Sequence, residues 1–130
     1  MVGLDTNVLV RYFAQDDDLQ SPKANRMMEA LSDDEPGFIS MVSMVELVWV
    51  MQSVYQADRA TITRILQTLL SVSTITIENT ETVLKALRIY SNTQSDFADC
   101  LIVKSCEDAG CKTIMTFDVN AAKRCGMQLA

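Results

Sequence analysis

Short apolar runs alternate with longer helix-forming segments along this chain, and acidic residues lie close to the points where the runs end. Short apolar strands separated by helices are typical of a parallel sheet with helices on both faces. We therefore predict the α/β fold class, with one short central parallel sheet. The expected strands are residues 2–4, 38–40, 73–77 and 113–117, with a candidate edge strand at 127–129.

Helical periodicity or capping signals mark the segments between these runs. Ser21-Pro22 provides an N-cap and first-turn signal for a helix that reaches Leu31, and Asp58 can cap a helix that reaches Leu70. The segment 42–54 is apolar on nearly every helical face, which predicts that it is central in the core or contacts another chain. The other expected helices cover residues 8–13, 78–90, 95–110 and 120–125.

Length and composition favour one folded domain over residues 1–130, because nearly half of the 130 residues are apolar. The first strand begins at Val2, which leaves no room for a signal peptide, and no apolar stretch is long enough to span a membrane. We expect a cytoplasmic protein. The net charge of −6 argues against a large basic nucleic-acid-binding face, does not exclude a nuclease, and suits a basic protein partner.

Four carboxylates are expected at the edge of the sheet where the strands end and the helices begin: Asp5, Glu46, Asp99 and Asp118. Ligands bind at this edge of parallel sheets. The chain contains no histidine, and a site of carboxylates alone suits Mg²⁺ or Mn²⁺. If the four side chains converge, protons or a cation must neutralise them, because like charges within about 4–6 Å cannot all stay ionised, and a metal ion does so while keeping the oxygens available.

Ordinary structural roles could also account for most of these acids. Asp5 and Asp118 are suitable helix N-caps, and Asp96 and Asp99 could be first-turn acids of one helix, with Asp99 in a capping box. Glu46 is different, because its neighbours in the sequence are apolar. We expect it to be buried, at a cost of several kcal/mol unless a metal or a distant arginine neutralises it.

The four cysteines show no paired C-x-x-C spacing, and without histidine they cannot form a mixed zinc site. We interpret them as small buried apolar residues or reduced thiols. They are Cys100, Cys106, Cys111 and Cys125.

Four segments together resemble the PIN-domain ribonucleases, and within them the VapC-like toxins of bacterial type II toxin–antitoxin pairs. These segments are residues 4–12, 43–51, 96–102 and 116–118, so the resemblance covers essentially the whole chain. It implies a three-layer PIN-like fold and a metal-dependent endoribonuclease that hydrolyses RNA. VapC-like toxins pair as homodimers and are blocked by a small basic antitoxin, so the same partners are expected here.

The resemblance also assigns roles to individual residues. The acidic quartet of Asp5, Glu46, Asp99 and Asp118 corresponds to the family's catalytic and metal-binding acids. Asp96 would be an auxiliary acid, and the hydroxyls of Thr6 and Thr116 would lie beside the carboxylates. Arg11 and Lys104 are candidate phosphate contacts, although solvated surface charges explain them equally well.

Two other functions stay open from the sequence. One is a phosphatase of the haloacid-dehalogenase type with Asp5 as nucleophile, although the second Asp of such enzymes is replaced here by Asn7. The other is a non-catalytic module that binds a partner or acts as a co-repressor. Degenerate members of a nuclease fold usually lose acids, so the presence of all four argues for catalysis.

Overall fold

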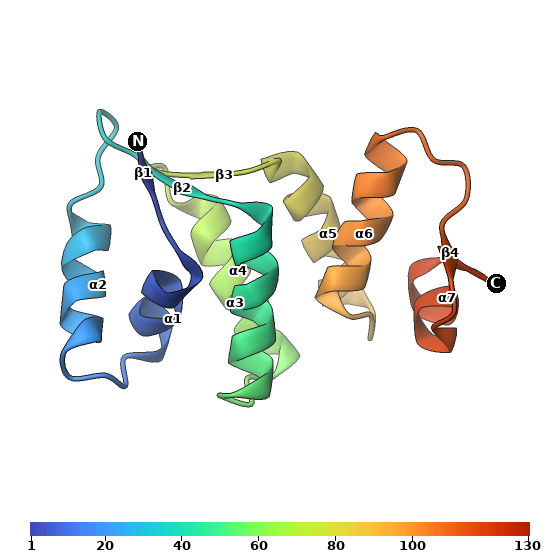
Figure 1. The fold of residues 1–130 in the computed structure, drawn as a ribbon, viewed down its shortest axis with the longest axis horizontal. Coiled ribbons are helices and arrows are strands. Elements are labelled where there is room, and N and C mark those ends of the chain that lie inside the picture. The colour runs from blue at the N-terminus through green and yellow to red at the C-terminus, as the bar shows by residue number, and fades with distance from the viewer. The chain divides into compact units, whose positions relative to one another are not determined.

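Five short strands and seven helices follow one another in the computed structural model, which describes residues 1–130 (Figure 1). Together with a short parallel sheet, they confirm the predicted α/β class. Tertiary contacts divide the chain into two compact units, residues 1–78 and 79–130. In chain order the elements are β1 (Val2–Gly3), α1 (Thr6–Ala14), α2 (Gln20–Glu29), β2 (Gly37–Ile39), α3 (Met41–Ser53), α4 (Arg59–Ser71), β3 (Ile75–Ile77), α5 (Thr80–Asn92), α6 (Phe97–Asp108), β4 (Met115–Thr116), α7 (Val119–Cys125) and β5 (Gln128–Leu129).

The sheet of the first unit contains three parallel strands in the order β1-β2-β3. Along β3, Ile75 and Ile77 are buried and Thr76 between them is exposed, which is the two-residue alternation of a strand. At the start of β2, a Cβ added to Gly37 would lie 2.9 Å from Cδ1 of Leu31 and 3.0 Å from Cδ1 of Leu4. Glycine at this position therefore leaves room for the side chains of Leu31 and Leu4 to pack against the strand.

The helices of the first unit share one apolar core. Helix α1 contacts α2 and α3, and α4 contacts α3 and β3. Leu9 of α1, Leu47 of α3 and Leu66 of α4 have no exposed surface. Burial of a leucine side chain contributes about 1.5–3 kcal/mol to stability, so this core fixes the helices that carry the acids of the unit.

The second unit is built on the packing of α5 against α6 (Figure 1). The fully buried rings of Tyr90 and Phe97 meet edge to face, with centroids 5.8 Å apart and planes at 89°. Strands β4 and β5 pair in parallel. A small apolar cluster of Val103, Ala121 and Met127 joins α6 to α7 and to the residue before β5.

Two predicted details are wrong. Helix α2 begins at Gln20, so Ser21 lies inside it and its hydroxyl donates to the Arg11 carbonyl at 2.8 Å. The chain before the helix is instead fixed by Asp17, whose Oδ1 accepts from the backbone N–H groups of Leu19 and Gln20. The strand predicted at residues 113–117 is also shorter than expected, since β4 covers only Met115–Thr116, and it pairs in parallel with β5 as a two-stranded sheet of the second unit.

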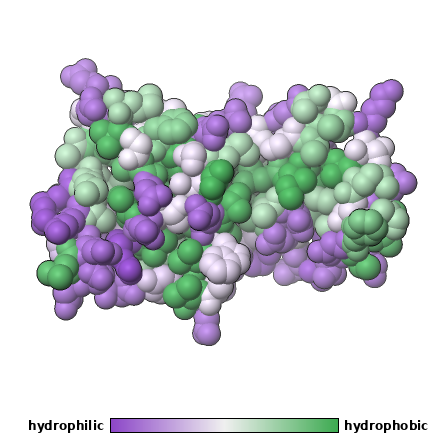
Figure 2. Space-filling view, in the orientation of Figure 1, coloured by the Kyte–Doolittle hydropathy of each residue, from purple (hydrophilic) through white to green (hydrophobic).

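Apolar side chains reach the surface in several places, and Figure 2 shows them in green among hydrophilic ones. On α3, Met44 and Leu47 are buried, whereas Val42 and Trp49 are 67% and 65% exposed. The all-round apolar helix of the sequence therefore has one face in the core and another in solvent. None of the helices combines the length and apolar character needed to cross a membrane.

Candidate functional site

Asp5 lies between β1 and α1, at the N-cap position, with an extended backbone (φ −75°, ψ 157°). Its side chain accepts no capping hydrogen bond, and the residue is exposed. The ordinary explanation for an Asp in this place, a side-chain cap, is therefore not realised. The backbone carbonyl accepts from the N–H of Val8 at 3.0 Å, so the fold holds the residue in place and leaves its carboxylate accessible.

Glu46 lies on α3, and its Oε1 accepts a hydrogen bond of 3.0 Å from Oγ1 of Thr6. Thr6 is itself buried at the start of α1, so it orients the carboxylate from a rigid position. The prediction that Glu46 is buried is wrong, because the side chain is exposed. Its apolar neighbours in the sequence do not indicate burial, because Leu47 and Val48 point into the core, whereas Glu46 lies on the other side of the helix.

Asp96 and Asp99 lie at the start of α6 in the second unit, as the N-cap residue and in the first turn. The first-turn position expected for Asp99 is confirmed, but the capping box is not formed, since the Asp96 side chain makes no capping hydrogen bond. Asp99 is half-buried, and its pKa is raised, first by desolvation and then by the negative charges of Asp96 and Asp118. The second unit therefore concentrates negative charge around Asp99.

Asp118 does act as a helix cap. Its Oδ1 accepts from the backbone N–H groups of Asn120 at 2.8 Å and Ala121 at 3.2 Å, at the start of α7. Thr116 supports it, because its Oγ1 accepts from the backbone N–H of Asp118 at 3.0 Å. Both capping bonds use Oδ1, so Oδ2 remains available to a ligand, and capping and ligand binding are compatible at this residue.

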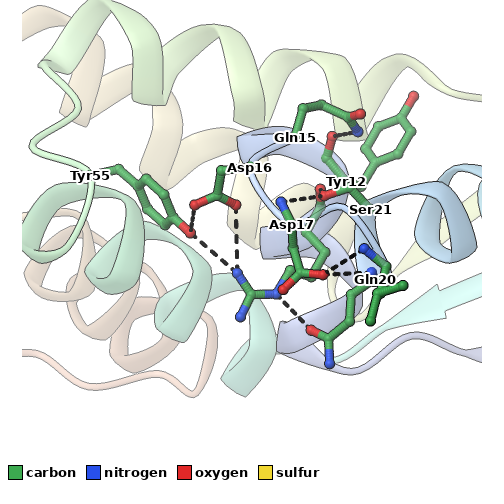
Figure 3. A network of polar contacts seen from close by, with 9 residues as sticks. Tyr12, Gln15, Asp16, Asp17, Gln20, Ser21 and Tyr55 are labelled. Carbon is green, nitrogen blue, oxygen red and sulfur yellow. Dashed lines mark hydrogen bonds and ion pairs between the residues drawn. The ribbon is translucent and has the colours of Figure 1, made fainter.

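Arg11 is held by partners within the first unit, and Figure 3 labels three of them, Asp16, Gln20 and Tyr55. Its Nε donates to Oε1 of Gln20 at 2.7 Å, and its Nη1 lies 3.5 Å from Oδ1 of Asp16 and donates to the Tyr55 hydroxyl at 3.4 Å. The Tyr55 hydroxyl donates to Oδ2 of Asp16 at 2.9 Å, and this bond raises the pKa of Tyr55. Arg11 therefore anchors the loop between α1 and α2, which gives this candidate phosphate contact a structural role.

Lys104, the second candidate phosphate contact, pairs on α6 with Glu107, one turn further along, at an Nζ to Oε2 distance of 2.8 Å. An exposed helical pair of this kind contributes little to stability. A substrate phosphate could compete with Glu107 for the ammonium group, so the pair leaves a phosphate contact open.

The donor atoms fit a hard divalent cation. The candidate acids offer carboxylate oxygens and the two threonines offer hydroxyls, which are ligand types that Mg²⁺ and Mn²⁺ accept. Neither unit by itself contains a group of three or more acidic or thiol side chains in metal-binding geometry. Asp5 and Glu46 belong to the first unit, and Asp96, Asp99 and Asp118 belong to the second.

Phe117 is a residue that the sequence interpretation missed. It was placed inside a strand, but β4 ends at Thr116 and the Phe117 side chain is 89% exposed, immediately before Asp118. An apolar residue after a strand looks like a continuation of that strand, so no sequence signal marks it. The network of Asp16 and Tyr55 was also missed, since the two residues are far apart in the chain.

Replacing Asp99 by Asn should raise the melting temperature in metal-free buffer at neutral pH. The raised pKa means that the folded state binds this proton more tightly than the unfolded state does. The ionised carboxylate therefore lowers the free energy of unfolding above its folded pKa, and the penalty disappears as the pH falls toward 3.8, the ordinary pKa of an aspartate. Thermal melts at a series of pH values in EDTA should show a gain for the variant that shrinks with decreasing pH.

Asp58 provides the matched control for this measurement. Its carboxylate caps α4 by accepting from the Thr61 N–H at 2.8 Å, and this bond lowers its pKa. Asp58→Ala should therefore lower the melting temperature at neutral pH. A melting temperature that falls for Asp99→Asn as well would show that Asp99 has a structural role.

Two comparisons with known proteins can be set beside this geometry. The family model for the PIN domain matches residues 2–126. A VapC ribonuclease from Aquifex aeolicus (strain VF5) is 25% identical over 114 residues, which is 88% of this chain and 84% of that relative. The range matched by the family model spans both units and includes every acid described above.

Proposed function

Because the chain belongs to the PIN domain family, we propose that it is an endoribonuclease that hydrolyses RNA phosphodiesters with Mg²⁺ or Mn²⁺. The relative named as a VapC ribonuclease supports RNA as the substrate. The observation that carries the proposal is the charge around Asp99, whose pKa is raised by burial and by two neighbouring carboxylates. Uncompensated negative charge of this kind is typical of functional sites. Membership of this family leaves no support for the phosphatase alternative.

We assign the catalytic and metal-binding roles to Asp5, Glu46, Asp99 and Asp118. A bound Mg²⁺ or Mn²⁺ supplies Lewis-acid polarisation of the phosphodiester and lowers the pKa of the attacking water. The protein itself would provide ionised carboxylate oxygens as ligands for the cation and would fix their positions.

Three further residues serve this task indirectly. Thr6 orients Glu46 through its hydroxyl, and Thr116 fixes the backbone of Asp118. Asp96 adds negative charge beside Asp99, which strengthens the attraction for a cation. We therefore treat Thr6 and Thr116 as positioning residues and Asp96 as an auxiliary acid.

Sequencing of RNA ends after brief expression of the protein in cells tests this function and identifies the substrate. Wild-type protein should create new ends at a restricted set of sites, with 5′ phosphates on the downstream fragments. Expression of Asp99→Asn at the same level provides the matched control. An end profile for the wild type that is indistinguishable from the profile of the variant would contradict the proposal.

The partners that we propose are a small basic antitoxin protein and a second copy of this chain. The net charge of −6 and the accessible carboxylates of Asp5 and Glu46 would attract an arginine or lysine of an antitoxin. Such a side chain would occupy the place of the cation. Inhibition should therefore weaken with added salt, or when the basic residue of the antitoxin is replaced by alanine.

Substitution of Trp49 by Glu should shift the protein from dimer to monomer. Trp49 and Val42 are two turns apart on α3 and are 65% and 67% exposed, so they present apolar surface on one side of the helix. A buried glutamate at the centre of a self-association surface would be costly. Sedimentation equilibrium at micromolar concentration measures the masses, and a monomeric wild-type protein with full RNase activity would end the dimer proposal.

A further inference from the structure

Helix α6 ends in a Schellman motif that brings two cysteines together. The N–H of Gly110 donates to the carbonyl of Glu107 at 3.0 Å, and the N–H of Cys111 donates to the carbonyl of Cys106 at 2.9 Å. Gly110 has the left-handed conformation that this motif requires, with φ of 90°. In such motifs the two residues joined by the hydrogen bond that spans more of the chain commonly have side chains in contact. Here these residues are Cys106 and Cys111, so both side chains are thiols.

The two thiols differ in their surroundings. Cys111 is exposed, whereas Cys106 is half-buried. Burial and then the neighbouring Cys111 thiol, which also forms a hydrogen bond with Cys106, raise the pKa of Cys106. The exposed Cys111 is therefore the thiol that an oxidant in solution reaches first, and Cys106 is next to it.

We propose that Cys106 and Cys111 form a reversible intramolecular disulfide when the protein meets a peroxide. The sequence favours small buried apolar residues or reduced thiols for both positions, and this proposal goes beyond that interpretation. The Cys111 thiolate attacks one peroxide oxygen, which gives a sulfenic acid and releases water after one proton is taken up. The Cys106 sulfur then displaces the hydroxyl group as a second water, and the S–S bond forms. Two thiols and one hydrogen peroxide thus give one disulfide and two waters, and a dithiol reductant reverses the change.

The backbone geometry explains why this pair, and not another, should react. Cys100 is buried in the core of the second unit and Cys125 is half-buried on α7, whereas the two hydrogen bonds hold Cys106 and Cys111 at fixed separation. A reaction between groups that are held together is favoured by a high effective concentration. The disulfide would close the chain around the turn at Gly110 and fix the C-terminal end of α6.

Tryptic mapping without reduction can identify this bond directly. Cleavage after Lys104 and Lys112 releases one peptide, residues 105–112, that contains both thiols, while Cys100 and Cys125 fall in two other peptides. After exposure to a small excess of hydrogen peroxide and alkylation, this peptide should be two hydrogens lighter and unalkylated, and the other two should be alkylated. Treatment with dithiothreitol before alkylation should restore two alkylated thiols. Full alkylation of residues 105–112 after peroxide, with the protein folded, would overturn the proposal.

Variants test the order of events and the role of the turn. Cys106→Ser should trap a sulfenic acid on Cys111 that reacts with dimedone, whereas Cys111→Ser should give little trapped product on Cys106. Oxidation should raise the melting temperature of the wild type by about 4–8 °C. It should leave the melting temperatures of Cys106→Ser and Cys111→Ser unchanged, because neither variant can form the disulfide. Cys125→Ser is the matched control and should behave like the wild type.

Gly110→Ala tests whether the disulfide depends on the geometry of the Schellman motif or only on the closeness of the two cysteines in the sequence. Open space surrounds Gly110, so alanine adds no clash, but it disfavours the positive φ. Disulfide formation should therefore slow several-fold in Gly110→Ala, and Gly110→Asn should recover most of the rate, because asparagine tolerates this conformation. Equal rates in all three proteins would show that the Schellman motif does not position the thiols.

Discussion

Replacing Asp99 by Asn should reduce metal-dependent RNA cleavage at least about a hundredfold. Loss of a side chain that merely supports a metal ligand costs about 10–100-fold in affinity or activity, so loss of a ligand should cost at least as much. The same result is expected for Asp5→Asn, Glu46→Gln and Asp118→Asn, whereas Asp96→Asn should show an intermediate loss. Initial rates on a short single-stranded RNA with Mg²⁺ measure each effect.

The amide substitutions are chosen so that the local hydrogen bonds survive. Gln at position 46 can still accept from Thr6, and Asn at position 118 can still cap α7. Asp17→Asn is the matched control, because Asp17 also caps a turn and its replacement should leave activity and any growth arrest unchanged. If two of the four quartet variants retained activity, the assignment of the site would be wrong.

The largest effect on stability is expected for Phe97→Ala, which should lower the free energy of unfolding by about 3–5 kcal/mol. Phe97 has no exposed surface and meets Tyr90 edge to face. Its removal leaves a cavity between α5 and α6, next to the turn that carries Asp96 and Asp99. Urea unfolding followed by far-ultraviolet circular dichroism measures the loss, because this signal comes from the helices of both units, whereas the single Trp lies in the first unit.

Ile102→Ala on the same helix is the control for this prediction. Ile102 is 47% exposed, so its truncation should cost no more than about 1 kcal/mol. Similar losses for both variants would mean that the packing of α5 on α6 contributes less than the structure implies.

The elements of this fold were largely predictable because their signals are local. The β-branched residues of the run 73–77 predicted β3, and Asp58 marked the start of α4 as a side-chain cap. The positions of Asp5 and Asp118 between a short strand and the next helix also followed from the order of the elements. These features depend on residues within a few positions of one another, which a single sequence displays.

Features that depend on side-chain direction or on distant partners were not predictable. The exposure of Glu46 follows from its angular position relative to Leu47 and Val48, and an all-apolar helix gives no sign of which face meets the core. The start of α2 depends on Asp17, and the anchoring of Arg11 depends on Tyr55, which lies in the loop between α3 and α4. The capping role of Asp118 could be proposed from the sequence. Only the structure shows that both capping bonds use Oδ1 of the carboxylate.

Cleavage of a labelled single-stranded RNA, measured while Mg²⁺ is added to EDTA-treated protein at constant ionic strength, tests the central claim most directly. The account predicts no cleavage before the metal is added, saturating cleavage as its concentration rises, and 5′ phosphates on the downstream products. Asp99→Asn in the same titration should show little cleavage at any metal concentration. Cleavage in EDTA with 2′,3′-cyclic phosphate ends, or equal rates for the two proteins, would contradict a metal-dependent nuclease built on these carboxylates.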